Sequence, residues 1–232
     1  MAMAAPIERT SLPDQVFDQL ARDVLSGRYA PGERLPTQRA LARELGVNLA
    51  SVREGIKRLE QLNLVEVRHG DAMRVRDWRA HGGPDVLVHA IAAGGTLDAE
   101  VLRSVFEARG LLLAESARLA AGRRSPEQAA LLGSLAHQIA SARDDEAAQR
   151  LDFAFFAVLI EAAGNLVFLL VFNSIRGLYL EHLELFRAMV GDREARAGLY
   201  DTAARAIAAQ DAEAAARAVA QLAAAQQQAL LP

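Results

Sequence analysis

Apolar residues recur at helical spacing over residues 11–26, which predicts an amphipathic helix. Its apolar stripe consists of Val16, Phe17, Leu20, Val24 and Leu25. Ser11 with Asp14 three positions later is a capping-box pattern, and Pro13 suits a first turn. Gly27 ends the pattern, and the turn-rich stretch "YAPGERLP" follows it.

Two further helices and a hairpin are predicted before residue 79. Thr37 is expected to cap a short helix that Gly46 ends, and Asn48 is expected to cap a third helix. The third helix carries an apolar stripe at i, i+4 and i+7, made by Val52, Ile56 and Leu59. Apolar residues then alternate on both sides of the turn "HGDA", which predicts a hairpin. Residues 1–79 therefore read as a winged helix-turn-helix.

Basic residues are crowded around this third helix and hairpin: Arg53, Lys57, Arg58, Arg68, His69 and Arg74. Because the apolar stripe faces inward, Arg53 and Lys57 are expected to point outward, and the hairpin is expected to bring Arg68, His69 and Arg74 to the same side. Such a cluster is often only a solvated surface. The turn-helix-hairpin context favours a DNA-binding face.

From residue 80 onward the pattern is helical with short breaks. Helices are expected near 84–93, 97–121, 125–142, 144–163, 165–190, 193–209 and 211–230. Short connections favour antiparallel neighbours in a bundle. The predicted fold is mainly α, with an all-helical ligand-sensing and dimerisation domain over residues 80–232. Asn165 in "AAGN" is expected to cap a helix.

Composition supports two domains and excludes some classes of protein. The chain has 232 residues, of which 52 % are hydrophobic and none is cysteine, so disulfides are excluded. No signal-peptide pattern is present, and the apolar run "LVFLLVF" is far too short for a membrane span. We therefore expect a soluble cytoplasmic protein without a membrane partner.

Charge is distributed unevenly along a chain whose net charge is −3. Residues 1–80 hold 13 Lys and Arg against 11 Asp and Glu, and the remainder holds 13 against 18. A DNA-facing N-terminal domain is compatible with this mild asymmetry if its cations share one face.

No catalytic pattern is evident, and an enzyme is not expected. No G-x-S-x-G, P-loop or G-x-G-x-x-G motif occurs, and His81, His89, His137 and His182 show no ligand spacing.

The stretch "LPTQRALARELGVNLASVREGIKRLEQLNLVEV" resembles the winged-helix signature of the GntR family of transcriptional regulators. "VRHGDAMRVRDW", "LDFAFFAVLIEAAGN" and "NSIRGLYLEHL" are similar to the FadR branch, and within it to the subgroup that senses long-chain acyl-CoA and represses fatty-acid degradation. The resemblance covers nearly the whole chain. It implies a ligand-responsive DNA-binding regulator, with fatty acyl-CoA or a fatty acid as its effector and lipid metabolism as its target.

The resemblance also implies the DNA contacts, which fall on Arg39, Asn48, Ser51, Arg53, His69 and Gly70. Arginine can bind a guanine edge with two hydrogen bonds, and small polar residues at a helix N-terminus can bind phosphate. The residue after Asn48 is usually arginine in this branch and is Leu49 here. Leucine offers a base at most a contact with a thymine methyl, so a different operator is expected.

Most effector domains of this branch hold a metal through an Asp and three His residues. The corresponding positions here are Asp152, Phe156, Tyr200 and Leu222. One carboxylate with a phenol is a poor transition-metal site, so no metal and no other cofactor is expected. The acyl-CoA subgroup has lost its metal in a similar way.

Asp152 then needs another partner, because its helix face is otherwise apolar. We expect a ligand-binding cavity lined by Arg109, Asp152, Asn173, Arg176, Tyr179 and Tyr200. Arg109 matches a position tied to acyl-CoA binding in the subgroup. Alternatively, these residues form a buried network that only fixes the register of the bundle. The last helix, "AVAQLAAAQQQALL", lacks the Gly/Ser pair and the Trp that contact the ligand head group in the subgroup.

These features predict a homodimer that binds a palindromic operator, with ligand entry shifting the DNA-binding heads. Two alternatives remain open: a metal-independent sensor of a small organic acid, and a dimeric DNA-binding protein that has no effector.

Overall fold

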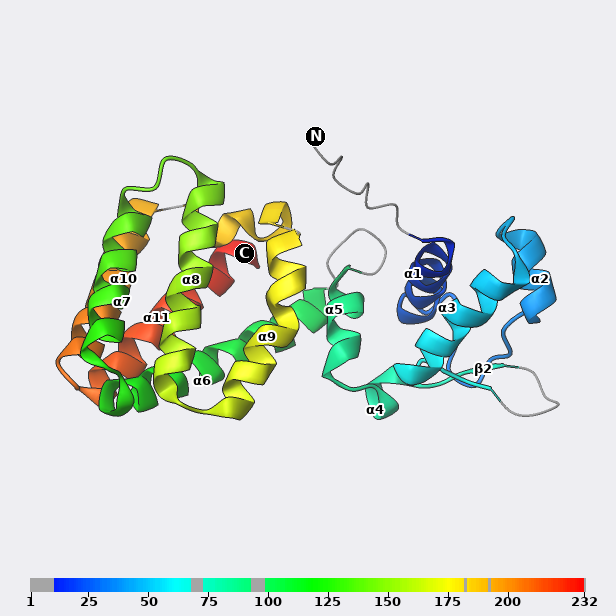
Figure 1. The fold of residues 1–232 in the computed structure, drawn as a ribbon, viewed down its shortest axis with the longest axis horizontal. Coiled ribbons are helices and arrows are strands. Elements are labelled where there is room, and N and C mark those ends of the chain that lie inside the picture. The colour runs from blue at the N-terminus through cyan, green and yellow to red at the C-terminus, as the bar shows by residue number, and fades with distance from the viewer. Residues whose placement is uncertain (1–10, 68–72, 93–98, 182, 192, 232) are drawn as a thin grey trace, which may run out of the picture. The chain divides into compact units, whose positions relative to one another are not determined.

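The computed structural model describes residues 11–67, 73–92, 99–181, 183–191 and 193–231 (Figure 1). The chain divides after residue 98 into two compact units. The first is a winged helix and the second is a bundle of helices, so the predicted fold class is confirmed.

The first unit contains every helix and strand that the pattern predicted. Its elements are α1 (Leu12–Leu25), α2 (Gln38–Glu44), α3 (Leu49–Gln61), β1 (Val65–Glu66), β2 (Arg74–Val75), α4 (Trp78–His81) and α5 (Pro84–Ala92). Ser11 and Asp14 form the reciprocal capping box of α1, and the side chains of Thr37 and Asn48 cap α2 and α3. Gly46 has a φ of +64°, which lets the chain turn sharply between α2 and α3.

The hairpin is antiparallel, with Val65 opposite Val75. It also pairs with the connector before α2, where the Leu35 N–H donates to the Met73 carbonyl at 2.9 Å. The guanidinium of Arg74 donates to the Gly32 carbonyl at 3.0 Å. Arg74 therefore fixes the hairpin to this connector.

The core of the first unit forms where the apolar stripe of α3 packs against α1. Val52 and Leu59 are fully buried beside Phe17 and Leu20 of α1. The two helices approach closely at Gly55, where a Cβ atom would lie 2.8 Å from Val16 Cγ1 and 3.2 Å from the Phe17 nitrogen. Only glycine therefore fits this crossing without a shift.

The sequence predicted a boundary after residue 79, whereas the two compact units divide after residue 98. The reason is α5, which packs against α1: Val86 is buried in the same core, and the ring of His89 meets the Phe17 ring edge-on at 4.9 Å. Burial lowers the pKa of His89. The short helix α4, which the pattern did not predict, precedes α5 and begins with an Asp77 cap.

The second unit is the predicted helical bundle (Figure 1). Its helices are α6 (Ala99–Arg123), α7 (Pro126–Ala140), α8 (Asp145–Ala163), α9 (Leu166–Glu181), the 3₁₀ helix η2 (Leu183–Met189), α10 (Arg193–Ala208) and α11 (Ala212–Leu230). Its core contains large buried side chains such as Phe155, Phe156 and Leu159 among many alanines. None of the helices in the described ranges combines the length and apolarity needed to cross a bilayer.

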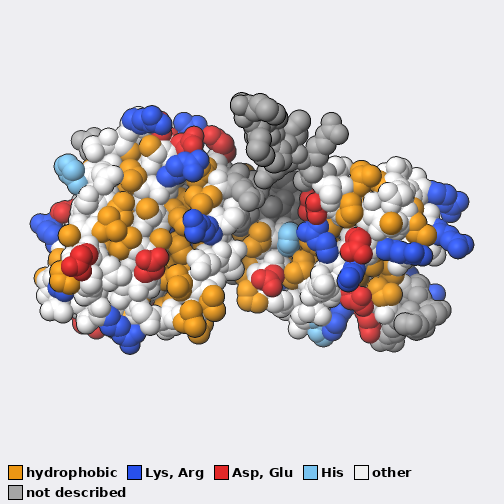
Figure 2. Space-filling model, in the orientation of Figure 1, with side chains coloured by type: hydrophobic (Ala, Val, Ile, Leu, Met, Phe, Trp, Pro, Cys, Tyr) orange, Lys and Arg blue, Asp and Glu red, His pale blue; other side chains and the backbone are white. Residues whose placement is uncertain are grey.

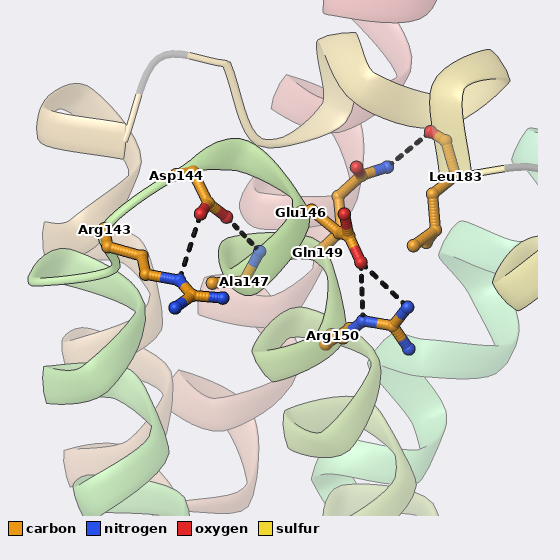
Figure 3. Close-up of polar contacts among 7 residues, drawn as sticks. All are labelled: Arg143, Asp144, Glu146, Ala147, Gln149, Arg150 and Leu183. Atoms are coloured by element: carbon orange, nitrogen blue, oxygen red, sulfur yellow. Dashed lines mark hydrogen bonds and ion pairs between the residues drawn. The ribbon is translucent and has the colours of Figure 1, made fainter.

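The single helix predicted over residues 165–190 is wrong, because α9 ends at Glu181 and η2 follows it. The amide of Gln149 donates to the Leu183 carbonyl at 2.7 Å and so ties η2 to α8 (Figure 3). Phe186 of η2 is buried and its ring stacks on Tyr179 of α9 at 5.3 Å. Tertiary contacts therefore reshape a segment whose apolar spacing alone suits a continuous helix.

Local side-chain contacts begin α8 and α9. Asp144 accepts a hydrogen bond from the Ala147 N–H at 2.7 Å and pairs with Arg143 at 3.0 Å (Figure 3). Asn165 accepts hydrogen bonds from two backbone N–H groups in the first turn of α9, at 3.0 and 3.4 Å. Its predicted role as a cap is confirmed.

We expect Gly55→Ala to destabilise the winged helix. Overpacking costs about 1–3 kcal/mol, which exceeds the roughly 1 kcal/mol that alanine gains over glycine within a helix. Chemical denaturation followed by the fluorescence of Trp78, the only tryptophan, measures this unit, because Trp78 packs against its core. The expected result is a lower unfolding midpoint.

The matched control is Gly133→Ala in α7, where a Cβ atom would meet nothing within 4 Å. Far-UV circular dichroism should show unchanged or increased stability for this variant. A Gly55→Ala variant as stable as the wild type would mean that α1 yields to the added methyl group at little cost.

Candidate functional site

Exposed cations on α2 and α3 form a candidate DNA-reading face. Arg39 lies on α2, and Arg53 and Lys57 lie one turn apart on α3, all with exposed side chains. The Arg53 Nε donates to Gln38 Oε1 at 3.4 Å, a long contact that links α3 to α2. Figure 2 shows Lys and Arg side chains gathered over α2. We call Arg39, Arg53 and Lys57 the reading face.

Asn48 and Ser51 differ in how far they reach this face. Asn48 is exposed, but its side-chain oxygen accepts a hydrogen bond from the Ser51 N–H at 2.8 Å as the cap of α3. Its amide NH₂ remains available to donate to a phosphate. Ser51 is only 5 % exposed and lies on the inner side of α3. The structure therefore brings Asn48, but not Ser51, to the surface with Arg53.

Arg58 belongs to the framework and not to the reading face. Its guanidinium pairs with Asp14 of α1 and lies over the Phe17 ring, 4.2 Å from the ring centre. The hydrogen bonds from the Ser11 side chain and backbone, and to a smaller extent the pairing with Arg58, hold the pKa of Asp14 below its usual value. His69 and Gly70, the predicted wing-tip contacts, lie outside the described residues, as does Arg68.

A buried polar network forms the candidate effector site in the second unit. Asp152 of α8, only 2 % exposed, accepts a hydrogen bond from the Tyr200 hydroxyl at 2.6 Å and one from the Tyr179 hydroxyl at 3.3 Å. The Gln226 amide of α11 donates to the same carboxylate at 2.8 Å and to the Tyr200 oxygen at 3.0 Å. Three helices thus supply donors to one carboxylate on a fourth. We call Asp152, Tyr179, Tyr200, Gln226 and Arg109 the buried network.

Arg109 brings a cation from α6 into this network. Its Nη2 donates to the Gln226 oxygen at 2.7 Å, so Gln226 bridges the guanidinium and the Asp152 carboxylate. The guanidinium carbon lies 4.9 Å from the centre of the Phe156 ring and 5.6 Å from that of Phe106. Although the residue as a whole is only partly buried, Nη1 is shielded from solvent and has no hydrogen-bond partner within the described part of the chain.

Burial governs the ionisation of this network. Desolvation raises the pKa of Asp152 above its usual value, against the opposing charge of Arg109 and the hydrogen bonds from Tyr200, Gln226 and Tyr179. Burial lowers the pKa of Arg109 and raises the pKa of both tyrosines. Since the folded carboxyl has the higher pKa, its stabilising contribution is present below the unfolded value of about 3.9 and is lost as pH rises through the folded value.

The structure therefore joins four of the six residues predicted for the cavity: Arg109, Asp152, Tyr179 and Tyr200. Asn173 and Arg176 are exposed on α9 and take no part in the network. Sequence reasoning missed Gln226, which is fully buried. It lies four positions after Leu222 on the same face of α11, but the run "AAAQQQ" gives it no distinguishing signal.

The residues present do not suit a metal. Around Asp152, the positions that match metal-binding histidines hold the buried side chains of Phe156, Tyr200 and Leu222. The donors near the carboxylate are two phenols and an amide, which are weak ligands for a transition metal. No three His, Cys, Asp or Glu side chains cluster as metal ligands in the part of the chain that is described.

We expect Tyr200→Phe to destabilise the bundle by about 1–3 kcal/mol, because a buried carboxylate loses its shortest hydrogen bond. Tyr179→Phe is the matched control: it removes the longer bond to the same carboxylate and should cost less. Chemical denaturation followed by far-UV circular dichroism measures both. Equal losses would mean that the two hydroxyl groups are interchangeable.

Each of the two units matches a known protein family. Residues 12–75 match the family model described as bacterial regulatory proteins, gntR family, and residues 104–225 match the FCD domain. The chain is 42 % identical to HTH-type transcriptional regulator Mce2R of Mycobacterium tuberculosis over 174 residues, which cover 75 % of this chain and 72 % of that protein. It is 30 % identical to HTH-type transcriptional repressor NanR of Salmonella newport, covering 82 % and 71 %.

Solved structures share the fold. Lar of Listeria monocytogenes aligns with a TM-score of 0.63 at 17 % identity, covering 96 % of this chain and 98 % of that one. At this identity the likeness shows the fold alone. Together, the two family models and the relatives establish that this chain belongs to the GntR family of DNA-binding transcriptional regulators, with an FCD domain as its C-terminal unit.

Proposed function

We propose that this regulator is a homodimeric cytoplasmic repressor whose helical unit binds an effector with an apolar chain and an acceptor oxygen, namely a fatty acid or a fatty acyl-CoA. The observation that carries this proposal is the buried Nη1 of Arg109, which lacks a partner within the described residues. A buried donor without an acceptor costs free energy, so a ligand oxygen placed there is favoured.

The surroundings of Arg109 favour an effector that has an apolar chain next to its acceptor oxygen. The guanidinium lies over two phenylalanine rings, Phe106 and Phe156. A carboxylate, or the carbonyl oxygen of a thioester, can accept from Nη1 while an alkyl chain contacts these rings. The residues around Asp152 lack a metal-ligand set, so we propose that the effector binds without a metal or another cofactor.

Through the buried network, an effector bound at Arg109 can change how the helices of the bundle are held together. Arg109 is hydrogen-bonded to Gln226, and Gln226 to both Asp152 and Tyr200, so α6, α8, α10 and α11 share one set of bonds. An effector that draws the guanidinium away from Gln226 changes the partners of a buried carboxylate. Repression is relieved if the arrangement that binds the effector binds operator DNA less well.

A second copy of the chain is proposed because winged-helix regulators read palindromic half-sites through two-fold symmetry. The helical unit has a surface suited to such pairing. Four apolar side chains in the first turns of α9 are 44–68 % exposed: Leu166, Val167, Leu170 and Val171. No charged residue lies between Leu166 and Val171, so two such faces can meet without burying a charge. Figure 2 shows hydrophobic side chains gathered over this part of α9.

Two other functions of the helical unit make different predictions. A small polar acid could accept from Arg109 Nη1 without using the phenylalanine rings. A unit without any effector would use the buried network only to fix the register of its helices.

We expect Arg53→Ala to weaken operator binding by about 1–3 kcal/mol if Arg53 contacts a base edge. Fluorescence anisotropy with a duplex selected from random sequence measures the dissociation constant. Native mass spectrometry of the same complex should show two chains on one palindromic duplex.

The control is Arg103→Ala, which removes one exposed arginine from α6 in the helical unit. It should leave operator affinity close to that of the wild type. A loss no larger for Arg53→Ala than for this control would place the reading face elsewhere.

For the effector, we expect oleate or oleoyl-CoA to weaken operator binding by about tenfold in the wild type, and Arg109→Lys to abolish most of that response. Lysine keeps a cation near Asp152 but lacks the planar fork that bonds Gln226 and a ligand together. Operator affinity without effector should be retained.

Arg103→Lys on the same helix is the matched control and should respond as the wild type does. A response to pyruvate but not to the two lipids would support the sensor of a small acid. No response to any of the three, with no small molecule in native mass spectra of the purified protein, would support a unit without an effector.

A further inference from the structure

A groove with an apolar floor lies beside Arg39 and Arg53 of the reading face. It has a volume of about 480 Å³ and is lined by Leu35, Thr37, Gln38, Arg39, Leu49, Arg53, Val67 and Met73. Leu35 and Met73 are almost fully buried and form its floor, whereas Leu49 and Val67 are more exposed. Arg39 and Arg53 provide exposed cations at its edge. The groove therefore combines an apolar interior with positive charge at its border.

The polar side chains around this groove are partly committed to the fold. Thr37 accepts from the Ala40 N–H at 3.2 Å as the cap of α2, and Asn48, next to Leu49, accepts from the Ser51 N–H. Gln38 accepts from Arg53. What the groove offers a DNA base is consequently the apolar surface of Leu49 and Val67, together with the two arginines.

Leu49 is the first residue of α3, and the N-terminal residues of a recognition helix are those that contact base edges in the major groove. Leucine cannot donate or accept a hydrogen bond. Among the groups that bases present in that groove, the only apolar one is the 5-methyl group of thymine. The charge at the border of the groove suits the phosphates and the guanine edges beside such a base.

We propose that Leu49 and the apolar floor beneath it read a thymine methyl group in each operator half-site. The inference rests on the DNA-binding function of the family and extends it to one base pair. Leu49 and Arg53 are four positions apart and share one face of α3, with about 6 Å between their Cβ atoms. Base pairs are about 3.4 Å apart, so this thymine lies one or two base pairs from the base that Arg53 contacts.

The test compares thymine with deoxyuridine, which differs only by lacking the methyl group. The full chain is used to select an operator, and each thymine of both half-sites is then replaced in turn. For the wild type, replacement at one symmetric position should weaken binding by roughly threefold to tenfold. For Leu49→Ala, the same replacement should not weaken binding further, because the contact between Leu49 and the methyl group is already lost in this variant.

Two further variants separate this contact from a general loss of folding or binding. Leu49→Met keeps an apolar side chain and should retain sensitivity to the methyl group. Arg53→Ala should bind less tightly yet keep the same ratio between thymine and deoxyuridine. Trp78 fluorescence verifies that each variant folds.

The outcomes are distinguishable. Equal deoxyuridine effects in the wild type and Leu49→Ala at every position would overturn the inference while leaving the DNA-binding function intact. Failure to select any sequence would overturn both.

Discussion

A carboxylate placed inside an apolar bundle constrains the whole second unit. Asp152 lies on α8 in the same turns as the buried side chains of Phe155, Phe156 and Leu159, and ionising it there is costly unless donors surround it. Those donors come from α9, α10 and α11, and the compensating cation comes from α6. The register of five helices is thereby tied to one side chain. A slip of any of them would leave a buried polar group without its partner.

The same network explains how this chain departs from the metal-binding pattern that the FadR branch resemblance implies. Where that pattern has histidines, the chain has Phe156, Tyr200 and Leu222. Two groups that the pattern does not include interact with the carboxylate instead. The Gln226 amide donates to it directly, and the Arg109 guanidinium donates to the Gln226 oxygen. A fixed cation is thus linked to the carboxylate through an amide. Unlike a metal, it leaves one donor, Nη1, without a partner in the described structure.

In the first unit, one packing contact decides which cations face outward. The stripe of α3 is buried against α1, and the close approach at Gly55 sets how α3 is seated. Arg53 and Lys57 then point away from the core, whereas Arg58 pairs with Asp14 and packs over the Phe17 ring. Neighbouring residues of one sequence cluster therefore serve two purposes. Among the described residues, Arg58 is thus not part of the reading face, and an apolar groove lined by Leu49 lies beside Arg39 and Arg53 of that face.

The sequence by itself determined the elements whose signals are local. The caps at Ser11, Thr37 and Asn48, the stripe of α3 and the hairpin all follow from residue spacing, because each depends on neighbours within one or two turns. Motif resemblance correctly indicated the family. Tertiary structure alone decided the features that depend on distant partners. These are the packing of α5 on α1, the 3₁₀ helix over residues 183–189, the burial of Ser51, the pairing of Arg58 with Asp14, and the exposure of Asn173 and Arg176. Gln226 is the clearest case. Its position in the sequence does not distinguish it from the other glutamines of an alanine-rich helix. Its hydrogen bonds to Asp152, Tyr200 and Arg109 form only because three other helices pack around it.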